Sequence, residues 1–227
     1  MTALRYCEPR EAAAPSMDPK PDCALCGAFV SATTAPRSPF APGALLFQQG
    51  DAVRLVYRII SGAVISYRLL SDGRRQVTGF HLPGDFLGLE AGVEHATTTE
   101  ALSRVDALAM ERTELAGRAV TDVDLARALW QVTVRAFRRS EDHALILARQ
   151  GATERVAAFL LDFAERMGRP EIIDLPMTRQ DIADHVGLTI HTVSRTLSQL
   201  QDQGMVEARS SRHVRLLQRR RLEGLCA

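Results

Sequence analysis

Residues 176–217 read PMTRQDIADHVGLTIHTVSRTLSQLQDQGMVEARSSRHVRLL, and this stretch decides how the chain folds. The hydroxyl of Thr178 can accept from the free backbone N–H groups at a helix start, and Asp181, three residues on, completes a capping box. Gly187 follows the apolar positions of this first helix, where a residue without Cβ allows a sharp turn. Thr189 can then cap a second helix. The stretch therefore predicts two short helices joined by a glycine turn.

The second of these helices, which ends at Gly204, has one apolar and one polar face. Its apolar face carries Val193, Leu197 and Leu200. Its other face carries side chains that can donate or accept hydrogen bonds, namely His191, Thr192, Ser194, Arg195 and Ser198. Such groups suit the base edges and phosphates of DNA.

A short β-hairpin is expected after the second helix. Residues 205–208 and 213–217 alternate apolar and polar side chains around Ser210-Ser211, and Arg209, Arg212 and Arg215 line the pair. Two capped helices followed by a basic hairpin are the layout of a winged helix-turn-helix that binds DNA. The alternative interpretation is an ordinary helical hairpin with a solvated charged face.

The charge of the chain is local rather than large. The 227 residues carry a formal net charge of +1, yet seven arginines follow His185 against Asp202, Glu207 and Glu223. A local basic surface is what the phosphates of double-stranded DNA attract. The N-terminus has no apolar signal region and no run of about eighteen apolar residues is present, so we expect a cytoplasmic protein without membrane contact.

Residues 39–115 are expected to form a β-roll of the jelly-roll or barrel type. Their short β-prone runs are separated by turn signals, of which Asp72-Gly73 between two alternating strands is the strongest. Residues 1–38 are rich in Pro, Ala and Ser and lack sustained periodicity. We expect a mobile N-terminal arm there, which contains the C-x-x-C pair Cys23 and Cys26.

A long helix is expected over residues 116–150. Side chains recur in it at alternating steps of four and three, like the a and d positions of a coiled coil. This seam consists of Ala126, Trp130, Thr133, Phe137, Ser140, Ala144 and Leu147. We expect it to form a homodimer, because a helix-turn-helix normally binds a palindromic operator as a two-fold pair. The alternative is a lone amphipathic helix that covers the roll.

Residues 151–227 are expected to form the DNA-binding domain. A further helix that begins at Gly151 supplies apolar residues to its core, and the hinge to the long helix falls near residues 149–153. The predicted fold class is therefore α+β. It consists of an N-terminal β-roll, a long dimerisation helix and a C-terminal winged helix-turn-helix.

This order of elements resembles the Crp/Fnr family of bacterial transcription regulators, and in particular its FixK/Fnr branch. Three stretches carry the likeness: DGRRQVTGFHLPGDFLGL at 72–89, ATERVAAFL at 152–160 and MTRQDIADHVGLTIHTVSRTL at 177–197. The resemblance implies a roll similar to a cyclic-nucleotide-binding domain. It also implies a homodimeric activator that contacts RNA polymerase and controls genes for low-oxygen metabolism, nitrogen fixation or nitrogen-oxide metabolism.

By the same resemblance, the second helix enters the major groove of DNA. The family's E-x-x-S-R contact set falls on His191, Ser194 and Arg195, so position 191 departs from the usual glutamate. An imidazole can donate to guanine N7 or O6, and we therefore expect a different base to be accepted there. The remaining contacts to DNA are expected from Thr178, Arg179, Thr189, Thr192 and Arg212.

The cofactor of the Fnr branch is a [4Fe-4S] cluster that senses oxygen through four cysteines. In this chain Cys23 and Cys26 match the C-x-x-C part, Cys7 is a substitute for a third ligand, and residues 106–110 of the roll contain no cysteine. A redox or oxygen sensor with such a cluster is the alternative function. Zinc binding, a dithiol pair or no role at all are the other interpretations of these cysteines, and we expect no cofactor.

Cyclic AMP is the other ligand of the family, and the sequence argues against it. Its phosphate is paired by an arginine in the roll. No arginine lies between Arg75 and Arg104 here, whereas Glu90 and Glu94 do.

A cupin-like metalloenzyme fused to a DNA-binding domain is a further alternative. Such sites need two or three histidines and a carboxylate around a metal. His81 and His95 lie in the roll near Glu90, but without the H-x-H spacing, and we expect His81 to be a partly exposed strand residue. The chain also lacks G-x-S-x-G, Walker and H-E-x-x-H motifs, so we expect no enzymatic activity.

Overall fold

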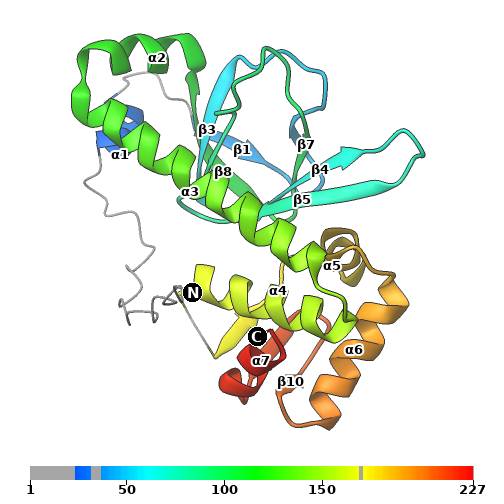
Figure 1. Cartoon of the computed structure of the whole chain (residues 1–227). Coiled ribbons are helices and arrows are strands. Elements are labelled where there is room, and N and C mark those ends of the chain that lie inside the picture. Colours follow the sequence, from blue (N-terminus) through cyan, green and yellow to red (C-terminus); the bar gives the residue numbers. More distant parts are fainter. Residues whose placement is uncertain (1–23, 32–36, 169–170, 227) are drawn as a thin grey trace, which may run out of the picture.

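The computed structural model describes residues 24–31, 37–168 and 171–226. Figure 1 shows a β-roll at one end of the chain, a long helix that runs along it, and a smaller unit of helices and strands at the other end. The predicted order of roll, long helix and winged helix-turn-helix is confirmed. None of the helices in these ranges is long and apolar enough to cross a membrane.

The roll consists of antiparallel sheets that enclose a common apolar core. Within the described residues one sheet has the strand order β1-β8-β3-β6 and the other the order β2-β7-β4-β5. The strands are β1 (Arg37–Phe40), β2 (Leu45–Phe47), β3 (Leu55–Ser61), β4 (Val64–Leu69), β5 (Arg75–His81), β6 (Phe86–Leu87), β7 (Thr98–Ala101) and β8 (Val105–Glu111). Ile59, Val64 and Val105 are at most 1% exposed in this core. The predicted hairpin at Asp72-Gly73 joins β4 to β5.

Part of the predicted mobile arm over residues 1–38 is instead helix α1 (Ala24–Ser31), whereas residues 1–23 and 32–36 lie outside the described residues. Leu25 and Phe29 lie one turn apart and are 0% and 1% exposed, in the same apolar cluster as Leu125. An apolar pair at this spacing gives even a short helix a face to bury. The run was too short for its periodicity to be recognised in the sequence. Its docking partners lie far along the chain.

The helical stretch after the roll is broken, so the prediction of one helix over residues 116–150 is also corrected. It consists of α2 (Arg112–Thr121) and α3 (Val123–Ala148). Between them Asp122 has an extended backbone, and its carboxylate accepts from the backbone N–H of Leu125 at 2.9 Å. The aspartate thus satisfies a free donor of the new helix and lets the chain change direction.

The C-terminal unit is a winged helix-turn-helix. Its elements are α4 (Ala152–Arg166), β9 (Ile172–Asp174), α5 (Arg179–Val186), α6 (Ile190–Asp202), β10 (Val206–Ala208), β11 (His213–Leu216) and α7 (Arg219–Leu225). The helices share a core in which Phe163, Ile182 and Leu197 are at most 3% exposed. Strand β9 and helix α7 were not predicted, because β9 has three residues and Gln218, the N-cap residue of α7, makes no side-chain cap.

Replacing Phe29 by alanine tests whether α1 is an integral part of the roll. The buried ring is lost and a cavity remains, so we expect the free energy of unfolding to fall by about 3 kcal/mol. Urea unfolding followed by circular dichroism measures it. Val93→Ala, at a side chain that is 83% exposed, is the control and should change the value by less than about 0.5 kcal/mol. Equal midpoints for the two variants would contradict the docking of α1.

Candidate nucleic-acid interface

The start of helix α6 is built by local capping. Thr189 is its N-cap, and the Thr189 hydroxyl accepts from the backbone N–H of Thr192 at 3.2 Å. Before it, Gly187 ends α5 in the left-handed region with φ of 66°. A positive φ of this kind favours a residue without Cβ, so the glycine sets the turn between the two helices. Both features were predicted and both are confirmed.

Helix α6 buries one face and presents the other to solvent. Val193 and Leu200 are 0% exposed and Leu197 is 3% exposed, as predicted. His191, Ser194 and Arg195 are all exposed. Within the described part of the chain these three side chains make no hydrogen bond or ion pair. The structure therefore brings them together as a free polar row at the N-terminal half of the helix, where backbone N–H groups also attract phosphate.

The other predicted contact residues differ in how free they are. Arg212 is exposed in the turn between β10 and β11. The hydroxyls of Thr189 and Thr192 lie 2.9 Å apart and pair with each other. Thr178 is exposed, but its hydroxyl donates to the carboxylate of Asp181 at 2.6 Å and so serves the cap of α5.

Arg179 is half-buried rather than free. Its Nη1 is buried without a hydrogen-bond partner in the described chain, and burial lowers the pKa of its guanidinium. Arg179 is therefore less accessible to DNA than the exposed Arg195.

Helix α3 carries the predicted dimer seam, most of it exposed. Trp130 is 70% and Phe137 is 63% exposed, and Thr133, Ser140 and Ala144 are exposed as well. Leu147 differs, because it is half-buried and its Cδ2 lies next to Gly187 of the helix-turn-helix. The free part of the seam therefore ends before Leu147, which packs on the DNA-binding unit of its own chain.

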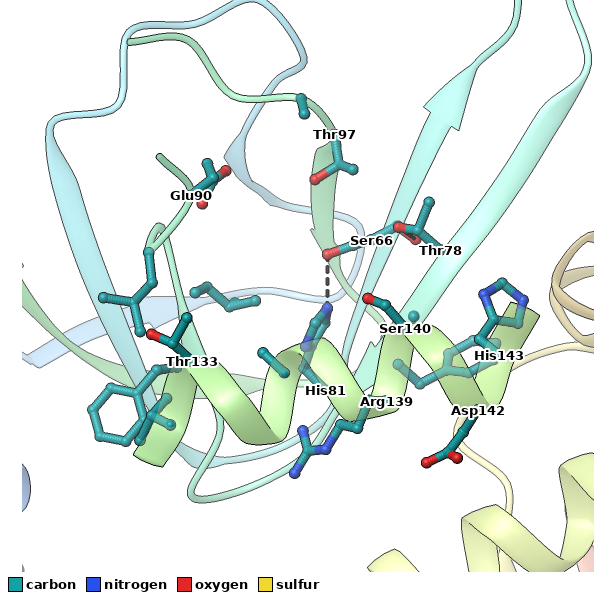
Figure 2. Close-up of a pocket in the computed structure, with 18 of the residues that line it drawn as sticks. Ser66, Thr78, His81, Glu90, Thr97, Thr133, Arg139, Ser140, Asp142 and His143 are labelled. Carbon is teal, nitrogen blue, oxygen red and sulfur yellow. Dashed lines mark hydrogen bonds between the residues drawn. The ribbon is translucent and has the colours of Figure 1, made fainter. Parts of the chain in front are cut away.

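A cavity of about 410 Å³ lies between the roll, α3 and the C-terminal unit. Figure 2 shows His81 and Ser66 of the roll facing Arg139, Ser140 and His143 of α3 across it. His81 is half-buried, as expected, and its Nε2 lies 2.8 Å from the Ser66 hydroxyl. Burial lowers the pKa of His81 to about 4. The ring is therefore neutral at physiological pH.

Arginines in this cavity are already engaged by a carboxylate. Asp85 lies 2.7 Å from Arg139 and 3.3 Å from Arg166. Burial alone would raise the pKa of Asp85, but the two guanidinium groups outweigh it and lower the pKa. Both arginines therefore already have an anionic partner inside the protein.

The metal-ligand interpretations find no support in the described residues. Among them no group of three or more His, Cys, Asp or Glu is placed to hold a metal ion. His95 instead contacts Glu90 at 2.7 Å and stacks on Phe47 with ring centroids 3.7 Å apart.

The cysteines do not form a four-thiolate set in the part of the chain that the structure describes. Cys7 and Cys23 lie outside the described residues, and Cys26 belongs to α1. Strand β8, where the roll ligand was sought, contains no cysteine. Cys226 follows α7, which Figure 1 places in the C-terminal unit, away from α1.

His185 is a buried residue that the sequence did not indicate. It is 7% exposed at the end of α5, and its Nδ1 donates to the carbonyl of Val77 in β5 at 3.2 Å. Its ring stacks on that of His143 with centroids 3.9 Å apart. Burial, and then the charge of a protonated His143, lower the pKa of His185 to about 3. Only the fold brings these residues together, since they lie more than forty positions apart in the sequence.

Comparisons with known proteins agree with this geometry. Residues 154–225 match the Crp-like helix-turn-helix domain and residues 37–121 the Cyclic nucleotide-binding domain. The chain is 40% identical over 187 residues to the Nitrogen fixation regulation protein FixK of Rhizobium meliloti (strain 1021), covering 82% of this chain and 85% of that one. It is 35% identical over 192 residues to the Transcriptional activatory protein AadR of Rhodopseudomonas palustris, covering 83% and 80%.

A solved structure extends the likeness to three dimensions. FixK2 from Bradyrhizobium japonicum superposes with a TM-score of 0.81 at 42% sequence identity, covering 85% of this chain and 98% of that one. At this identity and coverage the likeness includes the roll, the long helix and the helix-turn-helix together.

The low pKa values of His81 and His185 predict acid sensitivity. Both lie below the ordinary value of 6.5, so the unfolded chain binds more protons, and stability that is complete above pH 6.5 is lost as the pH falls. From pH 7.5 to 5.5 each histidine should lower the free energy of unfolding by about 1.4 kcal/mol. Urea unfolding at the two pH values measures the fall.

His185→Gln should reduce this fall by about half, because one of the two histidines is removed. His191→Gln, at an exposed position, is the matched control and should keep the whole fall. An undiminished fall in His185→Gln would show that the buried ring does not titrate as described.

Proposed function

This chain belongs to the Crp/Fnr family of DNA-binding transcription regulators, and on that premise we propose that it acts as a homodimeric activator on a palindromic operator. The observation that carries the proposal is the free row His191, Ser194 and Arg195 at the exposed end of α6. One relative is named for the regulation of nitrogen fixation and another as a transcriptional activator. The proposed target genes serve nitrogen fixation or the low-oxygen and nitrogen-oxide metabolism that the family resemblance implies. RNA polymerase is its partner at the promoter, and the cytoplasm, where its operator is found, is its location.

The three side chains of the row divide into roles. Arg195 can donate two hydrogen bonds to guanine, which is the commonest specific contact in the major groove. Ser194 can donate or accept beside it. His191 stands where the family usually has a glutamate, and a neutral imidazole donates one hydrogen bond, so it selects a base that offers an acceptor. Arg212 in the wing contacts the phosphates.

The exposed side of α3 supports the proposed dimerisation. Trp130 and Phe137 lie seven residues apart, so they project on the same side of the helix. These two aromatic side chains are 70% and 63% exposed, so a monomer leaves a large apolar area in contact with water. A second helix that covers them removes this area from water, which is favourable. A second copy of α3 supplies that cover and presents two recognition helices to two half-sites.

Neither an iron–sulfur cluster nor a cyclic nucleotide is needed in this proposal. A cluster needs four ligands, usually thiolates, and the roll offers none at β8. A cyclic nucleotide needs a free arginine, whereas Arg139 and Arg166 are both held by Asp85. In this proposal the protein has no enzymatic activity, and it acts by raising the initiation of transcription.

Operator selection from random duplexes tests the DNA-binding row. The selection is performed in air and without cyclic nucleotide, because the proposal requires neither a cluster nor that ligand. The selected duplexes should share a DNA sequence with two-fold symmetry. Arg195→Ala should lower affinity for that site by about 10-fold to 100-fold, since one bidentate base contact is lost. His191→Glu should change the selected base at one position of each half-site. Fluorescence anisotropy with the selected duplex gives the affinities.

Arg127→Ala is the matched control for charge, because Arg127 is exposed on α3 and pairs with Asp124. It should bind like the wild type. If His191→Ala and the wild type select identical half-sites, His191 does not contact a base and that assignment is wrong.

The double variant Trp130→Ala/Phe137→Ala tests the dimer. Removing two aromatic side chains from the seam should weaken self-association by at least about 100-fold. Sedimentation velocity at micromolar concentration should then show a dimer for the wild type and a monomer for the variant. Val120→Ala changes a side chain that is 83% exposed on α2 and should stay dimeric. A dimeric double variant would place the interface elsewhere.

A further inference from the structure

Helix α5 of the helix-turn-helix packs directly on strand β5 of the roll. Figure 1 shows strand β5 next to α5, although residues 82–178 separate the two elements in the sequence. Apolar side chains of both units belong to one continuous cluster, which includes Val77 and Phe80 of β5 together with Ile182 and Val186 of α5. The roll and the DNA-binding unit therefore share a core rather than merely a hinge.

Arg75 is the polar centre of this contact. Its Nε donates to Asp184 at 3.0 Å, and its Nη2 contacts both Asp181 and Asp184. The two carboxylate side chains are only 8% and 14% exposed, and that of Arg75 is 29% exposed. Asp181 also accepts from the backbone N–H of Thr178 at 2.8 Å, so Arg75 holds the capped start of α5. A charge pair this sheltered is screened much less than one on the surface.

The opposite end of α5 is held as well. Gln76 donates from Nε2 to the backbone carbonyl of Asp184 at 2.8 Å. His185 donates to the carbonyl of Val77, while His143 of α3 donates from Nε2 to the carbonyl of His185 at 2.8 Å. Helix α5 is thus held between the roll and the dimerisation helix at successive residues.

This contact fixes where the recognition helix points. The two units are also joined by the short hinge between α3, which ends at Ala148, and α4, which begins at Ala152, and by Arg166 of α4, which contacts Asp85 of the roll at 3.3 Å. Only residues 187–189 separate α5 from α6, and the two helices share a core, so α6 moves with α5. In a dimer both recognition helices have to reach half-sites one helical turn of DNA apart. Freedom at the contact would have to be lost on binding, which lowers affinity.

We propose that Arg75 is a positioning residue for DNA binding, which acts through Asp181 and Asp184 to hold the recognition helix in register with the operator. It does not touch DNA itself. The proposal rests on the function proposed above and adds to it the roll residue on which operator affinity depends. The free row on α6 is exposed in the same structure in which Arg75 holds α5, so this contact leaves the row accessible to DNA.

The test compares Arg75→Ala with Arg74→Ala on the selected operator. The two variants remove the same charge from neighbouring positions, but Arg74 pairs with Asp72 of its own exposed hairpin turn and, among the described residues, not with α5. Arg75→Ala should bind about tenfold more weakly, within the usual range of coupling between sites. Arg74→Ala should bind like the wild type, and Arg75→Lys should recover part of the loss.

Salt dependence separates positioning from direct phosphate contact. The slope of log affinity against log salt concentration should be unchanged in Arg75→Ala, because no phosphate contact is lost. In Arg212→Ala the slope should fall by about one. Gln76→Ala removes the hydrogen bond to the carbonyl of Asp184 without changing charge, and it should weaken binding about threefold. This second variant keeps the proposal testable if Arg75→Ala, which leaves two carboxylates unpaired, fails to fold. Circular dichroism and sedimentation confirm that each variant is folded and dimeric.

Two results would overturn the proposal: folded Arg75→Ala and Gln76→Ala dimers that bind as tightly as the wild type or more tightly, or a slope that falls in Arg75→Ala as it does in Arg212→Ala. Failure of the proposed function has a different signature, since the wild type itself would then select no operator.

Discussion

Helix α3 carries two apolar stripes, one that packs on its own chain and one that is exposed, and the remainder of the structure depends on this arrangement. Leu125, Val132 and Ile146 are buried on its inner side, whereas Trp130 and Phe137 stay exposed. Residues seven apart return to nearly the same side of a helix, so one helix can present two neighbouring stripes. The break at Asp122 matters for this reason. It ends α2 and lets α3 take its own direction along the roll, so that both stripes find a surface.

Local signals in the sequence predicted those features that need only a few neighbouring residues. The capping box of Thr178, the left-handed Gly187 and the hairpin at Asp72-Gly73 are all as expected. What could not be predicted depends on contacts between distant segments. Helix α1 is stable because Leu25 and Phe29 find a hydrophobic cluster formed by the roll and α3, and β9 exists because β11 lies beside it. The local pattern of α6 predicted the exposed row His191, Ser194 and Arg195, but nothing in the sequence predicted that α5, next to it, packs on β5.

The arginines of the chain include buried ones that pair with carboxylates and exposed ones that do not, and the small net charge does not distinguish them. Arg75, Arg139 and Arg166 are partly or largely buried and each faces a carboxylate, so their charge is neutralised inside the chain. Arg195 and Arg212 are exposed on the helix and the wing, with no ion pair in the described chain. A buried guanidinium without a carboxylate would be strongly destabilising, whereas an exposed one remains available to phosphate. Burial therefore decides which arginines build the fold and which can meet DNA.

Helix α5 lies between the buried groups that hold the DNA-binding unit on the roll and the exposed groups on α6 that face DNA. It is held by groups that solvent reaches poorly, among them the stacked pair His143 and His185, whose rings lie 3.9 Å apart. Two cations could not share that spacing in a buried site, and burial keeps His185 neutral by lowering its pKa to about 3. Salt screens buried contacts little and exposed ones strongly. We therefore expect the orientation of the recognition helix to depend less on ionic strength than its attraction to DNA does.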